Sequence, residues 1–339
     1  MSRASEGAGA LSEGAAHSSA DGAPRLPVGR YRLHYRAVQP VRLPEYAGST
    51  WRGALGHALK RAVCVTREPT CCACLLYSSC AYAYVFETPP PPGSAKMRLY
   101  PAAPHPFVLE PAEGVARDVS AGDELTLGLT LLGHANRFLP YLVHALGRAG
   151  DEGIGKGKGR LDLLAVSQAP PGPDNDWRTI HEPGGPLAAL PPSIPEIRPA
   201  PEAVALEIHT PLRLQRDGRN VGPEDLRFAD LFGNLLRRLS MLTYFHTDTP
   251  LETDFAALVA QARTVEWSDR ALAWRDWTRY SSRQQTTLQM GGVTGRLAVD
   301  LRGHERLWPY LWLGQWTHAG KGTSMGLGRY TVTTPDQCP

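Results

Sequence analysis

Proline divides this chain into two parts. Residues 168–202 of the 339-residue sequence include Pro170-Pro171-Gly172-Pro173, Gly184-Gly185-Pro186 and Pro191-Pro192. Proline lacks a backbone donor and fixes φ, so this stretch excludes a central strand or a helix interior. We predict that residues 168–202 are an inter-domain linker, because the sequence on each side is long enough for one domain of ordinary size.

The two parts share one order of predicted elements. Before the linker, residues 27–167 predict a strand at 31–38, a helix at 51–63 with Ser49 or Thr50 as N-cap, a strand pair near 124–132, a helix near 139–147 and a strand at 161–166. After it, residues 203–339 predict a strand at 203–214, helices at 223–244 (Pro223 in the first turn) and 254–262, a strand and hairpin within 271–301, a short helix near 305–315 and a strand at 330–333. Both parts approximate β-α-β-β-α-β, so we predict an α+β fold of two tandem ferredoxin-like domains.

The N-terminal residues differ from both domains in composition. Residues 1–26 are rich in Ala, Gly and Ser and lack the pattern of a signal peptide, which predicts a disordered tail on a cytoplasmic protein. No apolar run has the length of a membrane span. The net charge of +3 permits an anionic partner without requiring one, because a local patch matters more than the total charge.

A glycine-rich loop precedes the last predicted strand. Residues 320–328 contain four glycines, which can adopt φ > 0, approach a ligand closely and offer N–H groups to phosphate. A nucleotide P-loop is excluded because Gly322 follows Lys321, and the dinucleotide pattern fails at Met325. A second basic glycine run occupies residues 153–160. We predict contacts to an anionic ligand, with a plain turn as the alternative, from His318, Gly320, Lys321, Gly322, Gly326, Gly328, Arg329, Lys156 and Lys158.

Aromatic and arginine residues alternate in the segment 274–284. Arg275, Arg279 and Arg283 would share one face of a strand with Trp277. Arginine binds phosphate through forked hydrogen bonds, and aromatic rings stack on unpaired bases. This pattern predicts an RNA contact, and the alternative is an amphipathic strand whose charges are merely solvated.

Five of the six cysteines lie between residues 64 and 80. Such clustering without a signal peptide favours a metal over a disulfide framework. Cys71 and Cys74 form a Cys-x-x-Cys pair, and Cys64 and Cys80 complete four ligands for a structural zinc, which leaves Cys72 spare. An iron–sulfur cluster and free thiols remain alternatives. A four-sulfur site is closed, so no catalytic metal is expected there.

The predicted helix 51–63 has one polar face. His57, near Lys60, could move a proton beside a group that stabilises an oxyanion, and Tyr46 could add a hydroxyl. The alternative is a solvated face. Two further histidines compete for this role: His246, which as a cation would favour the end of its helix, and His318. His34, within a strand, reads as structural.

Several of these motifs together resemble a known family. The segments 279–284, 291–295, 318–321 and 326–330 resemble the endoribonuclease of the repeat-associated mysterious protein (RAMP) superfamily that processes CRISPR precursor RNA. The segments 51–56 and 80–87 resemble its cysteine-containing branch.

This resemblance implies metal-independent cleavage within each repeat, in which the 2′-OH attacks the phosphate and leaves 2′,3′-cyclic phosphate and 5′-OH ends. It implies that the product crRNA stays bound and that other subunits of a CRISPR effector complex are partners. By position, His57 matches the family's general base, with Tyr46 and Lys60 as helpers. Two rival readings remain: a non-catalytic crRNA-binding subunit, and a zinc-containing DNA-binding or scaffolding module.

Overall fold

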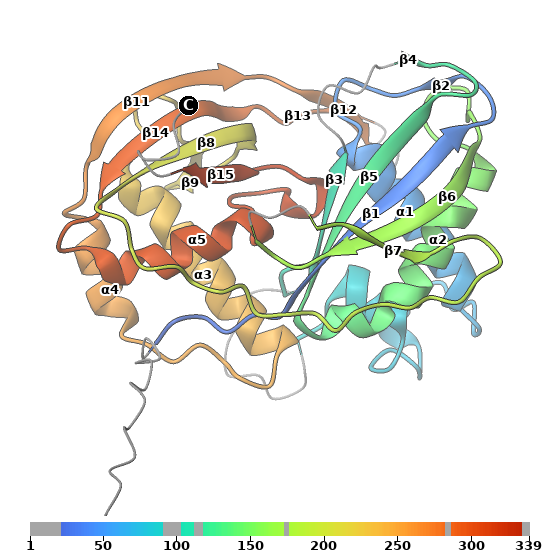
Figure 1. Ribbon diagram of the computed structural model, residues 1–339, viewed down its shortest axis with the longest axis horizontal. Helices are drawn as coiled ribbons and strands as arrows, with labels where there is room; N and C mark the ends of the chain where they lie inside the picture. Colours follow the sequence, from blue (N-terminus) through green and yellow to red (C-terminus); the bar gives the residue numbers. More distant parts are fainter. Residues whose placement is uncertain (1–21, 91–102, 112–117, 173–175, 282–285, 334–339) are drawn as a thin grey trace, which may run out of the picture.

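The protein forms two domains that lie side by side (Figure 1). The computed structural model describes residues 22–90, 103–111, 118–172, 176–281 and 286–333. Within these ranges, no helix is both long enough and apolar enough to cross a membrane. Both domains place helices against an antiparallel sheet, which is the predicted α+β architecture.

The first domain is a ferredoxin-like unit with one added edge strand. Its sheet has the order β3-β5-β1-β6-β7 and its strands pair antiparallel. Without β7 this is the strand order that a βαββαβ unit gives. In chain order the elements are β1 (Val28–Ala37), β2 (Val41–Arg42), α1 (Gly48–Val63), η1 (Cys71–Ala73), the π-helix η2 (Ala83–Glu87), β3 (Phe107–Pro111), β4 (Asp118–Val119), β5 (Glu124–Leu132), η3 (Gly133–Phe138), α2 (Leu139–Glu152), β6 (Leu161–Ala169) and β7 (Arg178–His181).

The second domain repeats this plan with the sheet order β11-β14-β8-β15. A hairpin of β12 and β13 extends from it between β11 and β14. The elements are β8 (Ala203–Leu212), β9 (Gln215–Arg216), β10 (Arg219–Asn220), α3 (Phe228–His246), α4 (Phe255–Ala262), β11 (Trp267–Arg275), β12 (Thr278–Ser281), β13 (Thr286–Gln289), β14 (Gly292–Asp300), η4 (Glu305–Leu307), α5 (Trp308–Thr317), η5 (Thr323–Met325) and β15 (Tyr330–Thr333).

Each sheet buries one face against its own helices. In the first domain, alternate residues of β1 pack with apolar side chains of α1 and α2, and the rings of Tyr35 and Trp51 lie 5.3 Å apart. In the second, β8 and β14 pack against α3 and α5. Leu26 is fully buried in this second core, so the predicted tail 1–26 is wrong at its end, while residues 1–21 lie outside the described residues.

Several predicted boundaries were wrong for identifiable reasons. Residues 124–132 form the single strand β5, and its partner is β3 rather than a neighbour in sequence. Helix α1 begins earlier than predicted, with Ala47 as N-cap and no side-chain cap. Helix α3 begins at Phe228, so Pro223 lies outside its first turn, and Asp230 caps the helix by accepting from the backbone N–H of Arg227.

The proline-rich linker is anchored along both domains. The linker includes the edge strand β7. Its prolines lie outside this strand, so they remove no hydrogen bond from the sheet. Gln168 exchanges two hydrogen bonds with the backbone of Leu190, of 2.8 and 2.9 Å. Further on, the indoles of Trp308 and Trp312 donate to linker carbonyls. The linker therefore follows a fixed path over the surface of both domains.

Candidate nucleic-acid interface

The central strand of the first domain carries basic side chains on its open face. Successive residues of a strand point to opposite faces, and Tyr31, Leu33 and Tyr35 of β1 are buried. The opposite face of the same strand holds Arg30, Arg32, His34 and Arg36. The alternation of basic and apolar residues in this strand is visible in the sequence, and it is the signal that sequence reasoning missed for this face.

Part of this basic face forms a cavity of about 360 Å³. Arg30, Arg32 and His34 line it from β1, while Trp177 approaches from the start of β7. Arg329 reaches it from the second domain. We call this cavity the basic recess. Both domains contribute residues to it, so it forms only where the two domains are in contact.

An arginine and an aromatic ring form a stacked pair in the basic recess. The guanidinium carbon of Arg32 lies 3.9 Å from the centre of the Trp177 ring, and that of Arg30 lies 5.3 Å away. Arg30 also donates to the carbonyls of Pro170 and Gly172 at 3.2 and 3.1 Å, which fixes it against the linker. The indole N–H of Trp177 is buried and has no hydrogen-bond partner among the described residues. Such planar groups are surfaces on which unpaired bases stack.

The basic recess has an excess of positive charge. Burial lowers the pKa of Arg30, and the charges of Arg32 and Arg329 lower it further, while Glu110 opposes them. Burial is also the main reason that the pKa of Arg32 is lowered. Three guanidinium groups around one carboxylate repel one another, and a bound anion would relieve that repulsion.

Glu110 is held ionised at the edge of the basic recess. Burial by itself would raise its pKa, but the hydrogen bond and charge of His318, the charge of Arg329 and the Thr130 hydroxyl lower it to about 2. His318 Nε2 lies 3.4 Å and Arg329 Nε 3.7 Å from Glu110 Oε1. The His318 side chain is fully buried, and its other nitrogen bonds the Leu327 carbonyl. Its predicted contact with RNA was therefore wrong.

The C-terminal glycine loop, residues 318–330, is internal rather than open. The predicted cradle required free N–H groups, but protein acceptors take the N–H groups of Ala319, Gly320, Lys321, Met325, Gly326, Gly328 and Arg329. These donors are not available to phosphate, which corrects the predicted backbone role of Gly320, Gly326 and Gly328. The side chain of Lys321 is exposed and bonds Gln215.

Gly326 of this loop serves the contact between domains, whereas its other three glycines allow close packing within the second domain. Gly320, Gly322, Gly326 and Gly328 have φ values of +80°, +82°, +87° and +68°, which side chains rarely adopt. A Cβ on Gly326 would lie 2.5 Å from the carbonyl oxygen of Leu109 in β3. A Cβ on Gly48 of α1 would lie 1.9 Å from the carbonyl oxygen of Met325. Figure 1 shows this red segment beside β3, where it joins the two domains.

Tyr46 and the β12–β13 hairpin extend the contact between domains. The rings of Tyr46 and Trp277 stack with centres 4.2 Å apart, and the Tyr46 hydroxyl donates to the Met325 carbonyl. Burial is the main reason that the pKa of Tyr46 is raised. This hydroxyl therefore holds the glycine loop, keeps its proton and is a poor general acid.

The arginines of the segment 274–284 do not share one strand face as predicted. β11 ends at Arg275, which is exposed and pairs with Glu45 at 3.8 Å, while Trp277 is buried. Arg279 lies on β12, and Arg283 lies outside the described residues. The strand is interrupted at residues 276–277, between β11 and β12, which the sequence pattern did not reveal. Arg275 remains available at the surface for an RNA contact.

Arg52 links α1 to the glycine loop, a role that sequence reasoning missed. Its Nε donates to Ser324 Oγ at 3.1 Å, and its NH2 lies 2.9 Å from His105 Nε2. The Phe86 ring lies 5.3 Å from its guanidinium carbon. Burial, and next the charge of Arg52, lower the pKa of His105 to about 3, so His105 accepts the hydrogen bond as a neutral ring.

His246 also joins the domains, as a neutral side chain. It is buried, its Nε2 lies 2.9 Å from the Pro104 carbonyl, and its Nδ1 lies 2.8 Å from the Tyr84 hydroxyl. Burial is the main reason that its pKa falls to about 4. The predicted cation at the end of α3 was therefore wrong, because the helix end is covered by the first domain.

The structure separates Tyr46 from the other two predicted catalytic residues, His57 and Lys60, which lie one helical turn apart on α1. Tyr46 lies at the contact between domains, before α1 begins. Lys60 lies toward the other end of α1, where its Nζ is 5.5 Å from the Tyr82 ring and it lines the cysteine cavity. His57 is exposed on α1, about 14 Å along the helix from Gly48 at 1.5 Å per residue. Lys60 and Tyr46 are thus at opposite ends of the helix that carries His57.

The second basic glycine run is exposed at its tip, residues 156–158. Lys156 and Lys158 are exposed in the loop before β6. The backbone N–H of Lys156 donates to the Arg42 carbonyl at 2.9 Å, which holds the loop against β2. Gly157 has φ +86° with nothing within 4 Å of its missing Cβ. These two lysines stay a prediction for RNA contact.

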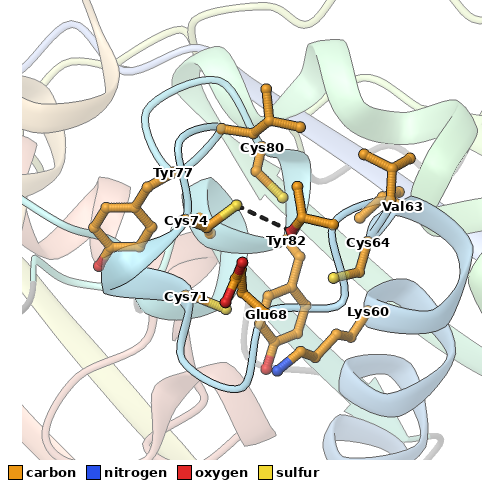
Figure 2. Close-up of a pocket in the computed structure, with 13 residues that line it drawn as sticks. Lys60, Val63, Cys64, Glu68, Cys71, Cys74, Tyr77, Cys80 and Tyr82 are labelled. Carbon is orange, nitrogen blue, oxygen red and sulfur yellow. Dashed lines mark hydrogen bonds between the residues drawn. The ribbon is translucent and has the colours of Figure 1, made fainter.

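Four of the cysteines line one small cavity. Figure 2 shows Cys64, Cys71, Cys74 and Cys80 around a shared space of about 30 Å³. Cys72 is exposed and does not line it. Among the described residues, no three His, Cys, Asp or Glu side chains already stand close enough together to hold a metal ion, and these five thiols are unbridged.

Two family models together cover most of the chain. Residues 26–192 match the family AF_1859_N, which is described as an N-terminal domain. Residues 206–330 match the CRISPR-associated endoribonuclease Cas6. The C-terminal part of the chain, residues 206–330, therefore contains a Cas6 domain. An uncharacterized protein of Archaeoglobus fulgidus is 25% identical over 310 residues, which are 89% of this chain and 96% of that protein. The predicted cysteine-containing branch stays a prediction.

Solved Cas6 structures share the fold. A Cas6 product complex has a TM-score of 0.56 at 18% identity and covers 90% of this chain and 100% of its own. The Cas6 of Thermus thermophilus has a TM-score of 0.51 at 18% identity, over 91% of this chain and 99% of its own. A partial Cas6-RT-Cas1–Cas2 complex gives 0.55 at 13% identity, over 93% of this chain and 47% of that one.

Proposed function

We propose that this protein is a cytoplasmic endoribonuclease that binds CRISPR repeat RNA and cleaves precursor crRNA. Cleavage uses the 2′-OH next to the scissile phosphate, requires no catalytic metal, and leaves 2′,3′-cyclic phosphate and 5′-OH ends. The product crRNA stays bound, and other subunits of a CRISPR effector complex are candidate partners. The observation that carries the proposal is the basic recess, in a chain that contains a Cas6 domain.

The basic recess suits single-stranded RNA better than a small anion. Its volume of about 360 Å³ accommodates a nucleotide-sized group. Arg30, Arg32 and Arg329 supply cations for phosphate oxygens. The ring of Trp177 with Arg32 supplies a surface for stacking. A repeat RNA offers both phosphates and unpaired bases, so it satisfies both parts of the site.

The chemistry requires a base for the 2′-OH, an acid for the leaving oxygen, and cations for the charged transition state. His57 remains our candidate base, because its ring is exposed on α1. Tyr46 is buried against Met325, and Lys60 faces the cysteine cavity. The proposal therefore rests on His57 and assigns no direct step to Tyr46 or Lys60.

The deciding experiment is cleavage of repeat RNA without added divalent metal, beside the same RNA with a 2′-deoxy substitution at the cleavage site. We expect cleavage of the first and not of the second, with cyclic phosphate ends. Cleavage of the deoxy RNA would refute attack by the 2′-OH. Any metal already bound to the protein should be measured in the same samples, so that loss of a structural ion is not mistaken for loss of a catalytic one.

His57→Ala tests the assigned base. We expect cleavage to fall by a factor of about 100 or more, the usual contribution of a general base, while RNA affinity stays nearly unchanged. Unchanged cleavage would remove His57 from the mechanism. Tight binding of repeat RNA with no cleavage by the wild-type protein would favour the alternative, a non-catalytic crRNA-binding subunit, whose basic recess would serve retention alone.

A further inference from the structure

The cysteine segment, residues 64–80, lacks the usual means of holding a fold. None of its residues is buried, and Val65 and Leu75 are 76% and 85% exposed. It contains one short 3-10 turn, η1, and no strand or α-helix. Ordering a backbone costs about 1–2 kcal/mol per residue, and apolar burial here is too small to offset that cost. A covalent or metal cross-link is the remaining stabilising device for such a segment.

The path of the segment brings four thiols together and leaves one out. Cys64 is the C-cap of α1, Cys71 begins η1, and Cys74 closes that turn with a 3.0 Å hydrogen bond from its N–H to the Cys71 carbonyl. Cys80 directly precedes the helical turn that leads into η2. All four line the same cavity, whereas Cys72, within the same turn, does not. The fold itself thus selects four sulfur atoms from five.

We propose that Cys64, Cys71, Cys74 and Cys80 bind one structural Zn²⁺. Four thiolates are a closed tetrahedral donor set for this ion. The cavity of about 30 Å³ has room for a single ion and not for a cluster of several iron and sulfide atoms. Because no three donors stand at binding distances among the described residues, the thiols close around the ion when it binds.

Neighbouring polar groups suit a metal–thiolate centre. Four thiolates and one Zn²⁺ carry a net charge of −2, and Lys60 lines the cavity as a countercharge. The Thr66 hydroxyl lies 3.2 Å from Cys74 Sγ, drawn as the dashed line in Figure 2. Hydroxyl and ammonium donors to coordinating sulfur orient the ligands and offset their charge. This assigns Lys60 to the metal site, away from the RNA.

The ion would tie the end of α1 to η2. Cys64 belongs to the first element, and Cys80 leads into the second. Phe86 of η2 packs beside Gly56 of α1 and against the Arg52 guanidinium, which in turn bonds Ser324 of the glycine loop. Loss of the ion would therefore loosen the α1–η2 pair first, and the contact between domains second.

The test is metal analysis of the full-length protein, purified without chelator, for the wild type and single serine variants. We expect about one Zn²⁺ per chain in the wild type and in the control Cys72→Ser. Cys71→Ser and Cys74→Ser should retain less than about one tenth of it after dialysis. Apo protein titrated with Co²⁺ should show the intense sulfur-to-metal absorption and the visible bands of a tetrahedral site with four thiolates.

This design separates zinc from each alternative. Iron with acid-labile sulfide, or disulfides among the four cysteines, would overturn the proposal. So would a wild-type protein that holds less than about 0.1 Zn²⁺ per chain after incubation with the ion, or a Cys72→Ser variant that loses as much as Cys74→Ser. If a ligand variant fails to fold, the Co²⁺ titration of wild-type apo protein still decides. RNA cleavage plays no part in the readout.

Discussion

The two glycine-rich loops stand at the same place in their domains and contact different parts of the molecule. Each precedes the last strand of its ferredoxin-like unit, β6 or β15. In the first loop, a Cβ on Gly155 would lie 2.1 Å from the Arg42 carbonyl oxygen of its own domain, and Gly157 has open space; in the second, a Cβ on Gly326 would lie 2.5 Å from the Leu109 carbonyl oxygen of the other domain. The two domains thus use the same loop position differently: the first loop exposes basic side chains, and the second forms part of the contact between domains.

The central strands of the two sheets, β1 and β8, also differ in the side chains on their open faces. The open face of β1 holds arginines, whereas the corresponding face of β8 holds Glu207 and His209. His209 bonds Thr331 within its own sheet. The basic face therefore belongs to the first domain, and the second domain contributes Arg329 to the basic recess.

Replacing one glycine of each loop by alanine should have the largest effect on folding stability and should distinguish the two loops. Gly328→Ala places a methyl group into the Ala319 carbonyl at φ +68°, so we expect a loss of more than about 3 kcal/mol of folding free energy, the range of severe core defects. Gly157→Ala meets no neighbour and should cost about 1–2 kcal/mol from its positive φ. Denaturant unfolding measures both, and equal losses would contradict the distinction.

The contact between domains should also control how the folding stability depends on pH. The pKa of His246 is lowered from 6.5 to about 4 by burial, so the unfolded chain binds this proton more readily than the folded one. Stability is then lost as pH falls from about 6.5 to 4, by up to about 3 kcal/mol at 1.36 kcal/mol per pKa unit. His246→Gln should flatten that part of the profile in denaturant titrations. His144→Gln, on an exposed histidine of α2, is the control, and a profile unchanged by His246→Gln would exclude this cause.

The open face of β1 should control RNA affinity without changing stability. Arg32→Ala removes a charge and the partner of Trp177, and we expect about tenfold weaker RNA binding, or about 1.4 kcal/mol. Arg36→Ala is the matched control, because Arg36 is on the same strand face but is exposed and paired with Glu124 at 2.8 Å. The measurement is binding of repeat RNA at several salt concentrations. A similar loss from both variants would mean that general charge, and not the basic recess, binds the RNA.

The smallest effect should come from the exposed lysines of the first glycine loop. Lys156→Ala with Lys158→Ala should weaken RNA binding a few-fold and lower the salt slope by at most about 0.7 per lost phosphate contact on single-stranded RNA. Lys321→Ala gives the comparison at the second loop, where the side chain bonds Gln215. No change in slope from the double variant would leave the first loop outside the interface.

Local patterns predicted most of the fold and part of the site. The amphipathic helices and the order of strands were readable, because burial imposes periods of 3.6 and 2 on the residues themselves. The sequence patterns did not predict β3, which pairs with β5 although residues 112–117, which the structure does not describe, lie between them. They also did not predict the contacts of Arg52 and Glu110. These depend on segments far apart in the chain, so no local spacing announces them.

The sequence by itself determined that residues 320–328 need glycine, that β1 alternates basic and apolar residues, and that the cysteines cluster. Only the tertiary structure decided that Gly326 packs closely against the other domain and that the N–H groups of Gly320, Gly326 and Gly328 are already bonded. It also decided that Arg30, Arg32 and Arg329 meet in one basic recess and that four of five clustered thiols share a cavity. The physical reason is that conformational freedom and periodicity belong to single segments, whereas burial, close approach and shared charge arise only between segments.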